Sequence, residues 1–244
     1  MLHLNQKLVL TAALAVAACG AAPAKAGVVI SGTRVVFPAA EREVSVRLAN
    51  TGDAPALVQS WIDDGDAKGT PETMGHVPFV IRPPVARVDP GSGQVLRIAH
   101  TGQAMPQDRE SVYFLNVLDV PAAARASAGD GVLHLVVRSR LKVFYRPKGL
   151  TAVGAAKAPS QLRWSVARDH EGWALKADNP TPYHVSVDAI VGVNNIGAEM
   201  VRPRATRTYR LSQAEYSSLG STVTFKIRTD HGAQVSVNAP LARN

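Results

Sequence analysis

One stretch of the chain, residues 131–147, constrains the fold more than any other part of the sequence. Between Gly131 and Pro147 it has no glycine or proline, and apolar and mainly basic positions alternate along it. The apolar positions are Leu133, Leu135, Val137, Leu141, Val143 and Tyr145. This alternation predicts a β-strand with one apolar face. Two interpretations stay open: the apolar face fills the protein's own core, or it lies on an edge strand that is offered to another protein.

The rest of the sequence after residue 26 also predicts strands. Residues 43–48, for example, alternate between apolar and polar, and turn-forming residues follow at 50–53. No helical period of useful length is present. Regularly spaced short strands separated by glycine, proline, asparagine and aspartate predict an all-β sandwich architecture.

A change of composition at residues 149–160 divides the chain. This stretch is rich in alanine and other small residues, and it predicts a flexible linker. We therefore expect a first domain at residues 27–148 and a smaller second domain at residues 161–244.

Residues 1–26 have the organisation of a secretory signal peptide. An apolar core at residues 8–18 is too short to span a bilayer, and an A-x-A cleavage site ends at Ala26. A lipoprotein cleavage box ending at Cys19 is the alternative, and we favour the A-x-A site because it directly precedes the first expected strand. Cys19 is the only cysteine, so cleavage at Ala26 leaves an exported chain with no disulfide. We expect a protein that is not embedded in a membrane.

The charge pattern and the motif content argue against several functions. The formal net charge is +8, but lysine and arginine are scattered singly, which does not favour a nucleic-acid partner. The seven histidines lack the spacing of metal ligands, so no metal is expected. No nucleophile-elbow, zinc-protease or phosphate-loop motif is present, so the sequence predicts neither an enzyme nor a cofactor.

Five phrases of the sequence resemble, in the same order, the periplasmic chaperones of the chaperone–usher pilus pathway. They lie at residues 32–37, 82–91, 106–116, 141–147 and 179–183. The phrase at residues 106–116 is the most specific, and the matches become sparse in the second domain. The resemblance implies an all-β fold of two immunoglobulin-like β-sandwich domains in an L (boomerang) arrangement with a cleft between them.

The resemblance also implies a function. A pilus subunit of this pathway lacks the last strand of its sandwich, and the chaperone lends it a strand in the periplasm, without ATP, before delivery to an outer-membrane usher. Leu133, Leu135 and Val137 would then fill the groove of the subunit. The alternative for all three is burial in the protein's own core. Self-association of the free protein through the same strand stays open.

Two ionic sites follow from the resemblance as well. Arg34 and Lys142 would bind the C-terminal carboxylate of the subunit through charge-assisted hydrogen bonds. Lys142 has the opposite parity to the groove-filling residues, so strand twist or a bulge must be considered. Glu110, Arg146 and Asp230 would form an ion network between the domains. The alternative for each is a solvated surface charge, and Asp230 also fits an ordinary hairpin turn.

A secreted two-domain sandwich that acts as a binding module, either pilin-like or glycan-binding, is the competing hypothesis. A pilin lacks a strand and often contains a disulfide. This chain instead predicts a second sandwich and has no cysteine after residue 26.

Overall fold

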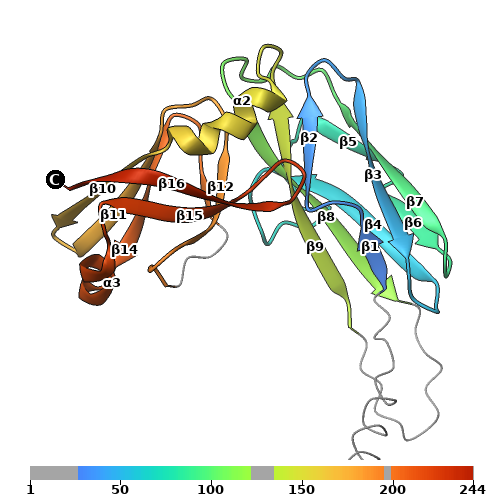
Figure 1. Cartoon of the computed structure of the whole chain (residues 1–244). Helices are drawn as coiled ribbons and strands as arrows, with labels where there is room; N and C mark the ends of the chain where they lie inside the picture. The colour runs from blue at the N-terminus through green and yellow to red at the C-terminus, as the bar shows by residue number, and fades with distance from the viewer. Residues whose placement is uncertain (1–26, 122–134, 195–198, 244) are drawn as a thin grey trace, which may run out of the picture.

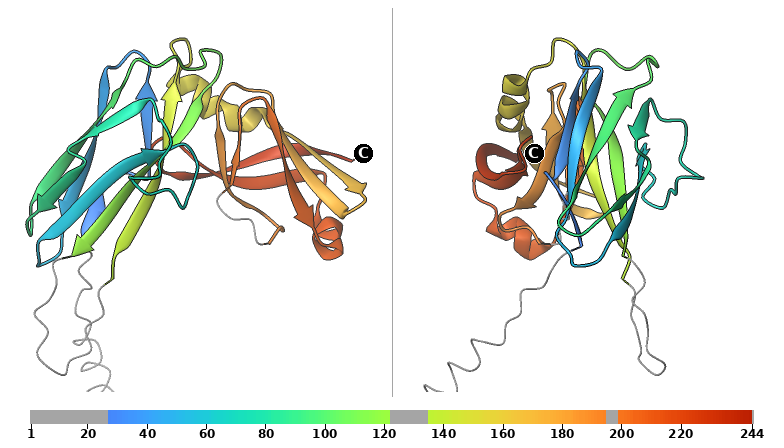
Figure 2. Two further views of the ribbon diagram at one scale, coloured as in Figure 1. Left: turned by 180° about the vertical axis from the view of Figure 1, so that it is seen from behind. Right: turned by 90° about the vertical axis from the view of Figure 1, so that its right-hand side faces the viewer.

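The computed structural model describes residues 27–121, 135–194 and 199–243. These residues form two β-sandwich domains that meet at an angle (Figure 1). Figure 2 shows the same angle from behind, with the connection between the domains running over the junction. The prediction of an all-β chain with two sandwich domains is confirmed.

The first domain is a sandwich of two sheets that share one core. One sheet has the order β1 (Val28–Ile30), β3 (Glu43–Asn50), β7 (Gly93–His100) and β5 (Phe79–Arg82). The other has the order β2 (Arg34–Pro38), β9 (Val137–Arg146), β8 (Ser111–Pro121), β4 (Ala56–Asp63) and β6 (Val85–Val88). Alternation along the strands turns apolar side chains such as Phe37, Leu96 and Val143 into the space between the sheets, where they are fully buried.

The apolar segment that opens the first domain divides between the two sheets. A turn at residues 31–33, with Gly32 at a φ of 97°, separates β1 from β2. β1 pairs with β3, whereas β2 pairs with β9 in the opposite sheet. The pairing of β2 with β9 consequently begins only at Arg34, opposite Lys142.

The strand β9 is the counterpart of the alternating stretch at residues 131–147. It pairs with β8 in an unbroken antiparallel register, from Val137 opposite Asp119 to Tyr145 opposite Ser111. Residues 137–141 pair only with β8 in the described part of the chain, because β2 covers β9 from Lys142 onward. The first half of β9 therefore has an unpaired edge.

The second domain is a sandwich whose two sheets are joined by one long strand, β16. Its strands follow the order β13 (Glu199–Val201), β12 (Val185–Ile190), β15 (Thr222–Arg228), β16 (Gln234–Arg243), β10 (Arg163–Asp169), β11 (Gly172–Asn179) and β14 (Ala205–Leu211). β16 pairs with β15 along most of its length and with β10 at its last residues, which links the two sheets. Trp164, Leu175 and Phe225 lie in the core between them.

The connection between the domains is helical, so the prediction of a flexible linker was wrong. Residues 152–161 form α2 (Ala152–Lys157) and the 3₁₀-helix η1 (Ala158–Gln161). The Thr151 hydroxyl accepts a hydrogen bond from the N–H of Gly154, and the Tyr183 hydroxyl accepts one from the N–H of Thr151 at 2.9 Å. A side chain at position 154 would overlap the Tyr183 ring. The absence of a side chain therefore lets α2 pack tightly on the second domain.

A second short helix, α3 (Gln213–Ser218), was also not predicted. It begins with a capping box, in which Ser212 and Glu215 satisfy each other's backbone N–H groups. The sequence shows no helical period of useful length, and helices of six residues are too short to produce one. The strands β6 and β13, of four and three residues, were not predicted either, because such short strands show no clear alternation.

Candidate functional site

A buried ion network around Arg146 lies where the two domains meet. Arg146 is the last residue of β9, and its Nε lies 2.7 Å from the Oε1 of Glu110. Its Nη1 lies 2.9 Å from the Oδ2 of Asp230, in the turn between β15 and β16. The Arg146 and Glu110 side chains are only 6% and 2% exposed. The structure thus brings these three residues together across the domain junction.

His184, which the sequence analysis missed, completes this network. Its backbone N–H donates to the Oε2 of Glu110 at 2.8 Å, and its Nδ1 lies 3.3 Å from the same oxygen. Burial lowers the pKa of His184 and so favours the neutral ring. The charged Glu110 carboxylate beside Nδ1 can only accept a hydrogen bond, so Nδ1–H is the donor in this contact. A lone histidine has no spacing signal that would mark such a role in a sequence.

The electrostatics of the network favour charged Glu110 and Arg146. Burial alone would raise the pKa of Glu110, but the hydrogen bonds from His184 and the charge of Arg146 outweigh it, so the pKa lies below its ordinary value. Burial alone would lower the pKa of Arg146, but Asp230 and Glu110 outweigh it and raise the pKa. The network is therefore a charge-compensated contact between the domains.

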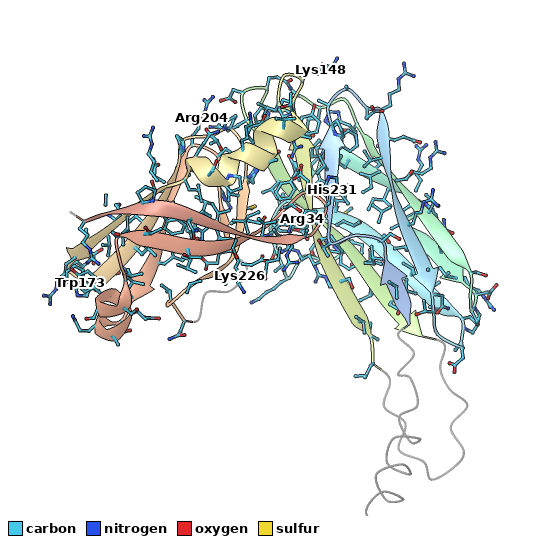
Figure 3. All side chains as sticks on the ribbon, in the orientation of Figure 1. Arg34, Lys148, Trp173, Arg204, Lys226 and His231 are labelled. Atoms are coloured by element: carbon cyan, nitrogen blue, oxygen red, sulfur yellow. The ribbon has the colours of Figure 1, made fainter. Side chains whose placement is uncertain are left out.

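Arg34 and Lys142 lie side by side on the face of the first domain that meets the second. They are direct partners in the parallel pairing of β2 and β9, so their side chains point to the same face of the sheet. The Nη1 of Arg34 donates to the backbone oxygen of Arg228 at 2.9 Å, and it lies 3.4 Å from the Oγ of Ser186. Figure 3 shows Arg34 at the junction of the domains. We call Arg34 and Lys142 the cleft cations.

Lys142 differs from the other basic residues on this face of β9. Arg138 donates to Asn116, Arg140 is paired with Asp63, and Arg146 is paired within the network described above. In the described part of the chain, the ammonium group of Lys142 has no hydrogen-bond or ion-pair partner. Burial and the charge of Arg34 lower the pKa of Lys142.

The surroundings of the cleft cations leave positive charge uncompensated. Burial and the charge of Arg228 lower the pKa of Arg34, and its Nε is buried with no partner in the described structure. The nearby Asp188 is already paired with Arg228 at 2.5 Å. Two half-buried cations with free donors form a suitable site for a carboxylate, which charge-assisted hydrogen bonds would hold strongly.

Apolar side chains are exposed at the start of β9 and just before it. Leu135 is 66% exposed and Val137 is 56% exposed, whereas Leu141, Val143 and Tyr145 have the same parity and are buried. Burial in the protein's own core therefore accounts for the second half of the alternating stretch and not for the first. Leu133 lies outside the described residues.

The two groups of predicted residues point to opposite faces of the sheet. The register between β8 and β9 is unbroken from Val137 to Tyr145, so no bulge changes the alternation. Lys142 consequently faces the second domain, while Val137 shares the side of β9 that carries the core residues. The free edge of β9 runs between them and ends where Arg34 begins β2.

Two further properties of the described residues bear on function. No helix among them is long and apolar enough to cross a membrane. Their histidine, cysteine, aspartate and glutamate side chains nowhere form a group of three or more that could hold a metal ion.

Comparisons with known proteins identify both domains. Residues 27–151 match "Pili and flagellar-assembly chaperone, PapD N-terminal domain", and residues 157–239 match "Pili assembly chaperone PapD, C-terminal domain". Chaperone protein FimB/FhaD of Bordetella pertussis is 48% identical over 193 residues, which cover 74% of this chain and 77% of the relative.

Solved structures agree with this assignment. The crystal structure of the CupB2 chaperone of Pseudomonas aeruginosa aligns with a TM-score of 0.70 at 36% identity, covering 88% of this chain and 100% of that one. The Salmonella enterica SafA pilin in complex with the SafB chaperone aligns with a TM-score of 0.71 at 25% identity, covering 91% of this chain and 99% of that one. The chain thus belongs to the family of pilus-assembly chaperones, a class of assembly proteins and not of enzymes.

Proposed function

We propose that the protein binds pilus subunits in the periplasm by adding β9 to their incomplete sandwich, and that it passes them to an outer-membrane usher. One observation carries this proposal: the first half of β9 has a free edge, and apolar side chains are exposed there at Val137 and just before it at Leu135. The edge supplies main-chain hydrogen bonds, and the exposed side chains supply apolar contacts. Leu133, two positions earlier in the sequence, would extend the same row.

The position of the cleft cations sets the direction of the incoming strand. A strand laid on the free edge of β9 occupies the place that β2 takes from Arg34 onward. If this strand runs parallel to β9, its C-terminal end meets Arg34 and Lys142. An antiparallel strand would bring its positively charged N-terminal end or a continuing chain there. The charge therefore favours a parallel strand that ends in a carboxylate.

The apolar contacts are large enough to matter. Full burial of one aliphatic side chain is worth about 1.5–3 kcal/mol. Leu135 and Val137 are 66% and 56% exposed, so about half of this gain remains for each. Together they would contribute roughly 1.5–3 kcal/mol to subunit binding.

The ion network would keep this site in shape. Arg146 links Glu110 of the first domain to Asp230 of the second, and Arg34 reaches Arg228 and Ser186 across the same junction. A change in the angle between the domains would move these partners away from Arg34. The network is thus proposed to position the carboxylate site.

The known proteins support the partner and the compartment. The SafB chaperone forms a complex with the SafA pilin, and the sequence begins with the pattern of a secretory signal peptide. Membership of the chaperone family and the resemblance in the sequence support the proposal that the subunit is delivered to an usher.

Co-expression with a pilus subunit of the same assembly system tests the proposal. Wild-type protein is expected to co-purify with the subunit and to protect it from degradation. Leu135→Glu places a charge in the apolar contact and should abolish co-purification while the chaperone stays folded. Val95→Glu, at a 42% exposed apolar position on the other sheet, is the matched control. Equal co-purification by wild type and Leu135→Glu would refute the role of β9.

A further inference from the structure

A cavity of about 440 Å³ lies between α2, the strands β15 and β16 of the second domain, and Arg34 of the first domain. Ala155 and Ala156 of α2 line one side, and Ile227, Val235 and Val237 of β15 and β16 line the other. Its volume falls in the range of cavities that hold small ligands, and its walls are mainly apolar.

The cavity exists because the helix above it carries small side chains. The side chains that α2 turns toward the strands are alanines: Ala155 packs against the core of the second domain, but neither Ala155 nor Ala156 is long enough to fill the space between helix and strands. As a result Ala156 is exposed, and Val235 on the facing strand is 45% exposed. Apolar surface on both walls is thus left without a packing partner.

Arg34 joins this cavity to the carboxylate site. It lines the cavity and is also the first residue of β2, at the point where the free edge of β9 ends. The carboxylates in the cavity wall, Glu110 and Asp230, are both paired with Arg146, so they do not oppose a second carboxylate at Arg34. The cavity therefore combines a cation at Arg34 with apolar walls on α2, β15 and β16, and Arg228 and His231 also line it.

We infer that this cavity receives the side chain of the last residue of a bound subunit and favours a bulky apolar one. The inference rests on the proposed function. The terminal carboxylate and the last side chain share one Cα, so binding of the carboxylate at Arg34 leaves that side chain within one side-chain length of the cavity mouth. The cavity thereby selects subunits by their final residue.

Peptides that copy the C-terminal strand of a pilus subunit provide the test. They carry a fluorescent label and end in Phe, Leu or Gly as free acids, with a Gly-ended amide for comparison. Fluorescence anisotropy measures their Kd for the purified full-length protein. The Phe- and Leu-ended acids are expected to bind at least about tenfold more tightly than the Gly-ended acid, as burial of one such side chain predicts.

Variants that fill the cavity show where this preference arises. Ala156→Leu and Val235→Phe change exposed positions on its two walls, so both proteins should fold, and both are expected to reduce the preference to less than about threefold without changing the Kd of the Gly-ended acid. Val153→Leu, at an exposed position of α2 that does not line the cavity, should leave the preference unchanged.

The outcomes separate the two proposals. No preference in the wild type, or an unchanged preference in both filling variants, overturns the inference about the cavity and leaves strand addition intact. Equal binding of the Gly-ended acid and its amide instead contradicts the carboxylate site, and with it the proposed function.

Discussion

Replacing Arg146 with methionine tests the ion network that joins the domains. Methionine keeps much of the apolar stem, but it removes both ion pairs and leaves Glu110, which is 2% exposed, with only His184 as a partner. Breaking a buried pair by removing one partner costs about 3–5 kcal/mol. We expect the free energy of unfolding, measured by urea denaturation at pH 7.5, to fall by this amount.

Two comparisons show whether burial is the cause. Arg97→Met removes an exposed ion pair with Glu43 in the first domain and should cost less than about 1 kcal/mol. Combining Arg146→Met with Glu110→Gln removes the unpaired buried charge, so it should recover at least about 1 kcal/mol relative to Arg146→Met alone. Equal losses for Arg146→Met and Arg97→Met would refute the reasoning.

Three further predictions concern other parts of the molecule. Burial lowers the pKa of His184 and of His100 from the ordinary value, so the unfolded chain takes up protons first as the pH falls. The free energy of unfolding, measured by urea denaturation, should therefore decrease as the pH drops below about 6.5. His184→Gln should make this pH dependence weaker, and an unchanged pH dependence would contradict the role of His184. Gly154→Ala should separate α2 from the second domain and lower Tm by several degrees, and a wild-type Tm would show that the close approach is unimportant. Arg34→Ala and Lys142→Ala should each give a folded protein that no longer accumulates subunit complexes, and normal complex yield in both would disprove the carboxylate site.

The alternating stretch at residues 131–147 shows how far sequence reasoning reaches. The pattern correctly indicated one apolar face, but Leu135 and Leu141 have the same parity and opposite burial. The difference depends on where the other strands end, because β2 covers β9 only from Lys142 onward. No local pattern contains that information.

The ionic residues show a second limit. Glu110, Arg146 and Asp230 are far apart in the sequence, and only the resemblance to a family grouped them. His184 joins them through its backbone N–H as well as its ring, which no residue pattern reveals. The helix α3 is a different case, because the spacing of Ser212 and Glu215 is a capping-box signal that was present in the sequence.

Amide hydrogen exchange of residues 137–141, with and without a bound pilus subunit, tests the central claim most directly. Strand addition predicts slower exchange at those amides of this segment that face the free edge. The amides of β6 (Val85–Val88), an edge strand of the same sheet, should be unaffected. Unchanged exchange at residues 137–141 in a complex that is fully formed would contradict the donation of β9.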